Sequence, residues 1–262
     1  PGLLVSDEVG KLLEEAEAEV KAEDLNYDSD DASYVRVLRR QYDKQVKIPT
    51  ELVAELSRVR SKAFITWRKA RKEDDFPLFQ PHLQKVVELN RKIADILGYD
   101  EHPYDALLDY YEPQMKTAQV AELFDDLKAG LVPLVEAIVE RGAENDASFF
   151  SKQDYAIDRQ WDLTEVILRE IGYDFRCGRQ DKAPHPFTTN FSSNDVRVTT
   201  RLFKNRPQSA LFSSVHEGGH ALYEQGIPEK FERTILAGGA TLCLHESQSR
   251  MWENLLGRRR AF

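Results

Sequence analysis

The stretch Val215-His216-Glu217-Gly218-Gly219-His220-Ala221-Leu222-Tyr223 carries the pattern H-E-x-x-H, and the rest of the chain is best understood from it. Histidines four apart on a helix are separated by about 400° of rotation and roughly 6 Å of rise, so His216 and His220 share one face. That face can present two imidazole nitrogens to one Zn²⁺ ion, at about 2.0–2.1 Å each. The stretch therefore predicts a helix that holds a metal.

The glutamate inside the pattern has a different place on the helix. Glu217 lies about 100° round the axis from His216, which suits it poorly as a third ligand and well as a neighbour of a water held by the metal. Zinc lowers the pKa of such a water towards 7, and a carboxylate beside it takes the proton as the water attacks a polarised carbonyl. The pattern predicts metal-assisted hydrolysis of an amide, with Glu217 as the general base. Co²⁺ would suit the same ligands.

A zinc site needs a third protein ligand, and Glu246 opens a second expected helix downstream. Residues 221–245 leave room to finish the first helix, turn and start another antiparallel to it. His245 is a rival third ligand because it adjoins Glu246. Gly218 and Gly219 each cost a helix interior about 0.8–1 kcal/mol relative to Ala, which indicates that substrate or a strand backbone passes close there. These features favour a metal site over a surface helix with two solvated histidines.

The spacing also separates classes of zinc site. The extended pattern H-E-x-x-H-x-x-G-x-x-H needs Gly at 223 and His at 226, but the chain has Tyr223 and Gly226, so that class is excluded. Structural zinc sites normally close with four protein ligands, and only three good ones are found here. A non-catalytic, zinc-stabilised helical binding protein is therefore the weaker alternative. The residues by themselves leave open which peptide end is read, so an aminopeptidase or an endopeptidase remains an alternative.

A β-rich segment precedes the metal helix. Residues 187–191 and 196–203 are expected to form a hairpin or short sheet, with a turn of Ser, Asn and Asp between them. The segment either walls the cleft or lines the peptide site, where Arg197 offers a cation and His185 a proton carrier. Asp195 is a candidate to orient a ligand imidazole, since zinc-bound histidines usually give their other N–H to an acceptor.

Helical periodicity dominates elsewhere. The expected helices are 6–25, 32–47, 50–72, 78–97, 117–141, 152–171 and 208–225. These segments show no fixed repeat period and no low-complexity linker. Residues 1–262 are therefore expected to form a single, mainly α-helical domain with a short β-hairpin or small sheet before the zinc-binding helix.

Composition limits the partners. The formal charge is −9 at pH 7 and the pI is near 5.3, which argues against a general binder of nucleic acid or of anionic membranes. Neither a run of 18 apolar residues nor a signal peptide occurs, so a cytoplasmic location is the default expectation. The two cysteines, Cys177 and Cys243, do not make a disulfide framework.

Several blocks of the sequence, in the same order, resemble the carboxypeptidase Taq family of zinc metallocarboxypeptidases. They are HPF at 185–187, DVRVT at 195–199, HEGGHALYEQGIP at 216–228 and HESQSRMWEN at 245–254, and YDALLDYYEP at 104–113 fits as well. The resemblance implies that His216, His220 and Glu246 are the zinc ligands, in preference to His245, and that Glu217 is the general base.

The resemblance also implies a helical, usually dimeric enzyme that removes single residues from the C-termini of peptides. Peptide substrates and a homodimer are therefore expected for the complete protein. Family members are about twice as long as these 262 residues, so the chain is expected to be an internal piece, incomplete at both ends. The motifs that hold the substrate's terminal carboxylate are expected beyond Phe262.

Overall fold

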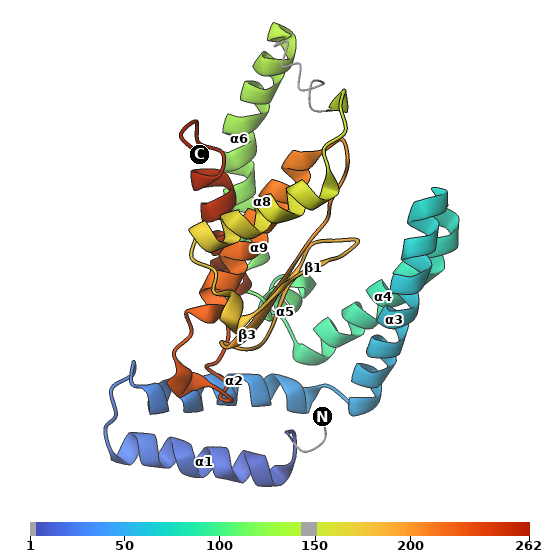
Figure 1. Cartoon of the computed structure of the whole chain (residues 1–262). Helices are drawn as coiled ribbons and strands as arrows, with labels where there is room; N and C mark the ends of the chain where they lie inside the picture. Colours follow the sequence, from blue (N-terminus) through green and yellow to red (C-terminus); the bar gives the residue numbers. More distant parts are fainter. Residues whose placement is uncertain (1–3, 143–150) are drawn as a thin grey trace. The chain divides into compact units, whose positions relative to one another are not determined.

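The computed structural model describes residues 4–142 and 151–262 (Figure 1). Its contacts divide the chain into two compact units, Pro1–Phe124 and Asp125–Phe262. Most described residues are helical and one small sheet is present, which confirms the mainly α prediction. None of the described helices is both long and apolar enough to cross a lipid bilayer. The expectation of a single domain over 1–262 stays a prediction.

The first unit is built from helices. They are α1 (Asp7–Ala22), α2 (Asp30–Lys47), α3 (Thr50–Glu73), α4 (Phe76–Leu97), α5 (Pro103–Leu108) and the first turns of α6 (Thr117–Arg141). Helices α3 and α4 pack as a hairpin, and Leu56, Leu89 and Ile93 form its buried cluster. Asp105 of α5 accepts hydrogen bonds from the backbone N–H and the hydroxyl of Thr117, which ties α5 to the start of α6.

The second unit carries the predicted metal motif. After the rest of α6, its elements are α8 (Ile157–Glu170), η1 (Phe175–Cys177), β1 (Gln180–Lys182), β2 (Thr188–Ser192), β3 (Asp195–Thr200), α9 (Pro207–Gln225), η2 (Glu229–Phe231), α10 (Leu242–Arg250) and η3 (Met251–Leu256). The helix expected to bind zinc is α9, which begins one residue before its expected start and ends where it was expected to end. Helix α10 carries Glu246, and η3 continues it with the wider π-helical turn.

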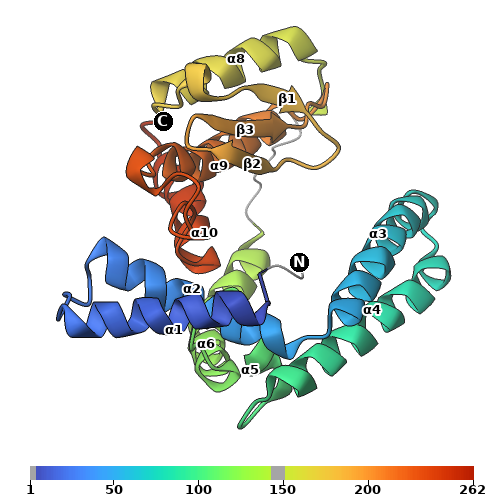
Figure 2. The ribbon, with the colours of Figure 1, turned by 90° about the horizontal axis from the view of Figure 1, so that it is seen from below.

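The sheet has three strands in the order β1-β3-β2 (Figure 2). Strands β2 and β3 form the expected antiparallel hairpin, with Thr188 opposite Val198 and a bulge between Asn190 and Ser192. The third strand, β1, was not expected. It runs parallel to β3 with Gln180 opposite Val198, and its three polar residues give no strand signal of their own.

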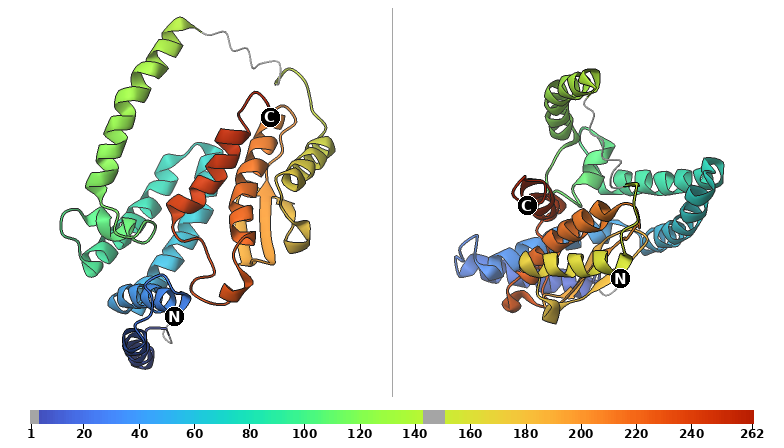
Figure 3. Two further views of the ribbon diagram at one scale, coloured as in Figure 1. Left: turned by 90° about the vertical axis from the view of Figure 1, so that its left-hand side faces the viewer. Right: turned by 45° about the horizontal axis from the view of Figure 1, so that its top comes forward.

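The core of this unit fixes the place of α9. Leu168 from α8, Val196 and Val198 from β3, and Ala221 from α9 form one buried cluster together with Tyr173. Helix α9 thus packs on the sheet and on α8, and α10 and η3 run along its other side (Figure 3). Helix α10 brings Glu246 to the face of α9 that carries His216 and His220.

The paired glycines of α9 mark two close approaches. A Cβ at Gly218 would lie 2.6 Å from Ile171 Cδ1 and 2.8 Å from Leu168 Cδ2, which are side-chain ends at and beside α8. A Cβ at Gly219 would lie 2.7 Å from the Cα of Ser249 and 2.8 Å from the carbonyl oxygen of Gln248, which are backbone atoms of α10. A close approach was expected from the sequence and is present, but its partner at Gly219 is the backbone of helix α10 and not a strand.

Candidate metal centre

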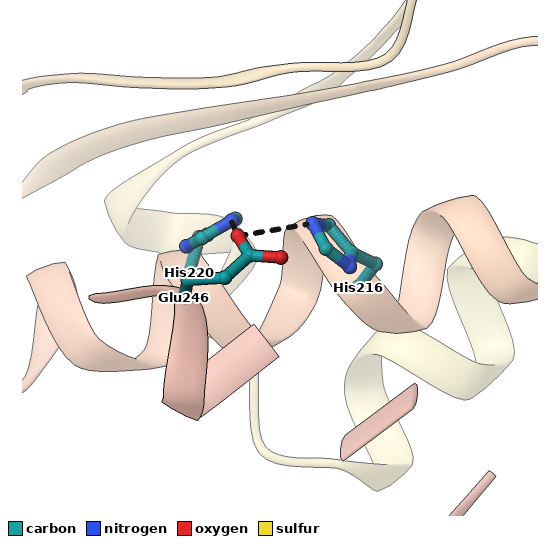
Figure 4. A group of neighbouring side chains, drawn as sticks. All are labelled: His216, His220 and Glu246. Atoms are coloured by element: carbon teal, nitrogen blue, oxygen red, sulfur yellow. Dashed lines mark ion pairs between the residues drawn. The ribbon is translucent and has the colours of Figure 1, made fainter. Parts of the chain in front are cut away.

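Three side chains from two helices converge on one point (Figure 4). His216 and His220 of α9 and Glu246 of α10 each bring one ligand atom to within 4.8 Å of the others. Glu246 Oε2 lies 3.4 Å from His220 Nε2 and 3.8 Å from His216 Nε2. Two ligands about 2.05 Å from a tetrahedral ion are about 3.3 Å apart, so the two distances from Glu246 are already close to the spacing of a metal site.

The chemistry of the three donors fits zinc. Burial, together with the neighbouring His245 and His216, lowers the pKa of His220 to about 4, so its imidazole is neutral at pH 7 and keeps a lone pair for a metal. Burial alone would raise the pKa of Glu246, but the hydrogen bond from Arg250 and the nearby His216 outweigh it and lower that pKa. Two imidazoles and one carboxylate are a common catalytic zinc set, with the fourth position left for water or substrate.

The two oxygens of Glu246 have separate partners. Arg250, one turn further along α10, donates from Nε to Glu246 Oε1 at 2.7 Å. Oε2 is the oxygen that faces the two histidines. The arginine thereby fixes the carboxylate so that a single oxygen points at the metal position.

The second nitrogen of His216 is bound by a carboxylate that the sequence did not suggest. Glu253, on η3, holds Oε2 2.9 Å from His216 Nδ1. Arg258 donates to the other oxygen of Glu253 at 2.6 Å. When His216 binds a metal through Nε2, its proton is on Nδ1. The Nδ1–H group then donates a hydrogen bond to Glu253, which fixes the ring in the orientation that binds the metal.

The second nitrogen of His220 faces His245, the residue considered as a rival ligand. The two Nδ1 atoms are 2.6 Å apart, and His245 Nε2 lies 2.6 Å from Glu224 Oε1. Glu246 belongs to the group of ligand atoms that converge, whereas His245 lies behind His220 with both ring nitrogens engaged. The structure therefore brings together the ligand set that the sequence resemblance implied.

Glu217 is buried beside this group, with only 6% of its surface exposed. The hydroxyl of Thr188, on β2, lies 2.7 Å from Glu217 Oε2 and 3.0 Å from its backbone oxygen. Burial raises the pKa of Glu217, while the hydrogen bond from Thr188 and the neighbouring His216 and His185 oppose the rise. A buried carboxylate with a raised pKa is a stronger proton acceptor than one in water.

The structure separates the remaining candidates. His185 is exposed in the loop before β2, near enough to Glu217 to influence its pKa. Arg197 and Asp195 of β3 bind each other through two hydrogen bonds of 2.7 Å. Successive side chains of a strand point to opposite faces, and Val196 and Val198 face the core, so Arg197 and Asp195 lie on the sheet face turned away from α9. Their roles in substrate binding and in orienting an imidazole stay predictions.

Some of the contacts at this centre had a signal in the sequence. Glu224 lies four residues after His220 and so on the same face of α9, and Glu253 lies seven residues after Glu246. Thr188 is two residues before Asn190 in an expected strand, so the two share a face. Periodicity could have assigned each side chain to a face of its helix or strand. The residue that it contacts on another element is known only from how the elements pack.

Comparison with known proteins shows the family of the chain. The family model for carboxypeptidase Taq (M32) metallopeptidases matches residues 2–262. The chain is 40% identical over 240 residues to carboxypeptidase 1 of Bacillus subtilis (strain 168), covering 92% of this chain and 47% of that protein. It is 39% identical over 268 residues to thermostable carboxypeptidase 1 of Pyrococcus furiosus, covering 99% of this chain and 51% of that protein.

Solved structures give the same result. The crystal structure of the M32 carboxypeptidase from Deinococcus radiodurans R1 is similar with a TM-score of 0.83 at 38% sequence identity, over 98% of this chain and 50% of that one. The chain thus spans about half the length of the relatives it matches. It belongs to the carboxypeptidase Taq (M32) family of metallopeptidases.

Proposed function

We propose that this chain carries the metal centre of a zinc-dependent metallocarboxypeptidase, which hydrolyses the C-terminal peptide bond of peptides with Glu217 as the general base. The observation that carries the proposal is the convergence of His216, His220 and Glu246 beside a buried Glu217. The names of the relatives support the choice of the C-terminal peptide bond, because the metal centre would equally serve an aminopeptidase or an endopeptidase.

The residues divide the chemistry between them. When bound, zinc supplies a Lewis acid that polarises the scissile carbonyl and lowers the pKa of water. Glu217 takes a proton from the water as the water oxygen bonds to the carbonyl carbon. It returns the proton to the leaving amine as the C–N bond breaks. Thr188 holds Glu217 Oε2 in place, and burial favours proton uptake by this carboxylate. His185, whose charge would act on Glu217, is proposed as a second proton carrier. Arg197 is proposed as a cation for substrate binding; because it faces away from α9 and is paired with Asp195, it would have to bind a part of the peptide remote from the metal position.

The wider setting is proposed on the same family ground. Peptides are the substrates, the complete protein is a homodimer, and its location is cytoplasmic. The acidic charge of the chain supports the exclusion of nucleic acid and anionic membranes as partners. Zinc is the metal that the two imidazoles and one carboxylate favour, and Co²⁺ would suit the same set.

The proposal is tested by replacing the base while keeping the ligands. In the complete protein, we expect Glu217→Gln to retain zinc and to lose about 10²–10⁴-fold in kcat, the usual contribution of a general base. Glu229→Gln, which makes the same chemical change at an exposed site of the same unit, is the control. The substrates are N-blocked and C-amidated peptides, assayed with and without a chelator.

Two results would contradict the proposal. Normal turnover by Glu217→Gln would mean that another group takes the proton. Cleavage of C-amidated peptides as fast as of peptides with a free C-terminal carboxylate would mean that the enzyme does not read that end.

A further inference from the structure

We propose that His245, Glu224 and Asn190 form a hydrogen-bonded chain that fixes His220 in its metal-binding tautomer and so sets the metal affinity of the centre. None of the three touches the reacting atoms, so they are positioning residues. The inference rests on the proposed function in one respect, that His220 binds zinc through Nε2.

The first link of the chain decides which nitrogen of His220 is free. His220 Nδ1 and His245 Nδ1 lie 2.6 Å apart, so one of them must donate a proton and the other must accept it. If His245 donates, the remaining proton of a neutral His220 sits on Nε2 and blocks the metal. If His220 donates, its Nε2 lone pair faces Glu246 Oε2 and the metal position.

The second link selects between these two states. His245 Nε2 lies 2.6 Å from Glu224 Oε1, and an ionised carboxylate only accepts hydrogen bonds. His245 must therefore carry its proton on Nε2, which leaves its Nδ1 as an acceptor when the ring is neutral. Glu224 thus acts through His245 to make His220 the donor at Nδ1 and the ligand at Nε2.

The third link fixes the carboxylate itself. Asn190, on β2, donates from Nδ2 to Glu224 Oε2 at 2.6 Å. Glu224 is only 5% exposed, so its carboxylate depends on these two neighbours for its hydrogen bonds. The chain therefore runs from the metal ligand on α9 through α10, back to α9 and on to the sheet.

Packing holds the middle ring of the chain in place. Tyr223 meets the His245 ring edge-on, with centroids 5.2 Å apart. A Cβ at Gly239 would lie 2.5 Å from His245 Cδ2, so the missing side chain at that position makes room for the ring. A ring packed in this way cannot turn away from His220 without moving its neighbours.

The chain mirrors the arrangement at the other histidine, with one difference. His216 Nδ1 is hydrogen-bonded directly to the carboxylate of Glu253, whereas His220 is linked to the carboxylate of Glu224 through the imidazole of His245. A carboxylate hydrogen-bonded to a metal-binding histidine makes the ring a more basic ligand for the metal. Loss of such a partner typically costs 10–100-fold in metal affinity.

The test measures the zinc dissociation constant by competition with a chromophoric chelator, together with the thermal stability of each zinc-free protein. We expect Glu224→Gln and His245→Leu each to weaken zinc binding about 10–100-fold. His245→Asn returns an acceptor oxygen near the position of Nδ1 and should recover part of the affinity lost in His245→Leu. Glu232→Gln is the matched control, because Glu232 also accepts hydrogen bonds from a β-turn residue, Ser193, but does not lead to a metal ligand.

A second measurement needs no substitution. Long-range ¹H–¹⁵N correlation spectra of the zinc-free wild-type protein, with ¹⁵N-labelled histidine, report which nitrogen of each ring carries the proton. We expect the proton on Nδ1 of His220 and on Nε2 of His245. The opposite tautomer at His220 would overturn the inference, as would wild-type zinc affinity in both Glu224→Gln and His245→Leu.

The outcomes keep this inference apart from the proposed function. A wild-type protein that binds zinc but cleaves no peptide would contradict the proposed activity. The hydrogen-bonded chain from His245 to Asn190 would still be supported by the zinc affinities and the histidine tautomers. A wild-type protein that binds no zinc would overturn both.

Discussion

Adding a single methyl group at Gly219 should displace Glu246, the proposed metal ligand on helix α10. The Cβ of Gly219→Ala would meet the Cα of Ser249 at 2.7 Å and the carbonyl oxygen of Gln248 at 2.8 Å. Carbon atoms pack at about 3.5–4.0 Å, so the backbone of α10 must retreat by about 0.8 Å, which is 3.5 less 2.7. Metal–ligand distances tolerate only about 0.2 Å, and Glu246 lies on α10.

The same numbers set the expected size of the effect. Overpacking against backbone costs about 1–3 kcal/mol, whereas Ala in place of Gly favours the helix by about 0.8–1 kcal/mol. The zinc-free variant should therefore lose between about 0 and 2 kcal/mol of unfolding free energy. Its zinc affinity should fall by at least about tenfold, as for other changes that misplace a ligand.

Gly218→Ala is the matched control, because it gives the same helix the same gain in propensity. Its Cβ meets the ends of the Ile171 and Leu168 side chains, so the neighbours that must adjust are near α8 and not on α10. We expect it to lower the unfolding free energy and to bind zinc within about threefold of the wild type. Urea unfolding of the zinc-free proteins and chelator competition measure the two quantities. Equal zinc affinity in the two variants would refute the argument that Gly219 sets the position of α10.

Three further changes test other parts of the fold. Hydrogen bonds from Thr117 lower the pKa of Asp105 in the folded protein. The ionised carboxylate therefore stabilises the fold at pH values above its unfolded pKa of about 3.9, and this stability is lost as the pH falls through the lower folded pKa. Asp105→Asn should therefore be less stable than the wild type to urea at pH 7, with a gap that closes in strong acid; a gap independent of pH would contradict this. Tyr173→Phe removes the hydroxyl that donates to the carbonyl of Val196 at 2.5 Å inside the core, and should cost about 1–2 kcal/mol in urea unfolding; an unchanged midpoint would show that water replaces the bond. Adding zinc at 100 times its dissociation constant to the chelated protein should raise the unfolding free energy by about 2.7 kcal/mol, seen as a higher thermal midpoint, and no rise would mean that the folded state binds no zinc.

Local periodicity explains how much could be predicted. The i, i+4 spacing placed His216 and His220 on one face, and the same geometry put Glu217 off that face. The helix around the motif was expected over 208–225, and α9 covers Pro207–Gln225. The hairpin of β2 and β3 followed from two β-rich runs around a turn.

Other features depended on pairing between distant segments. Strand β1 exists because its backbone pairs with β3, and its polar residues carry no alternation that would reveal it. The direction of Arg197 followed only once Val196 and Val198 were seen to face the core, since alternation fixes relative and not absolute faces.

The sequence by itself determined the face of α9 that His216 and His220 share and the place of Glu217 off that face, because both are a matter of spacing along one helix. The choice of Glu246 over His245 as the third ligand came from the resemblance. Only the tertiary structure decided which partners hold these groups. Thr188 behind Glu217, Glu253 behind His216, and His245 behind His220 lie 29, 37 and 25 residues from the groups they hold. No helical or strand period extends over such separations, so these contacts are decided by how α9, α10, η3 and the sheet pack together.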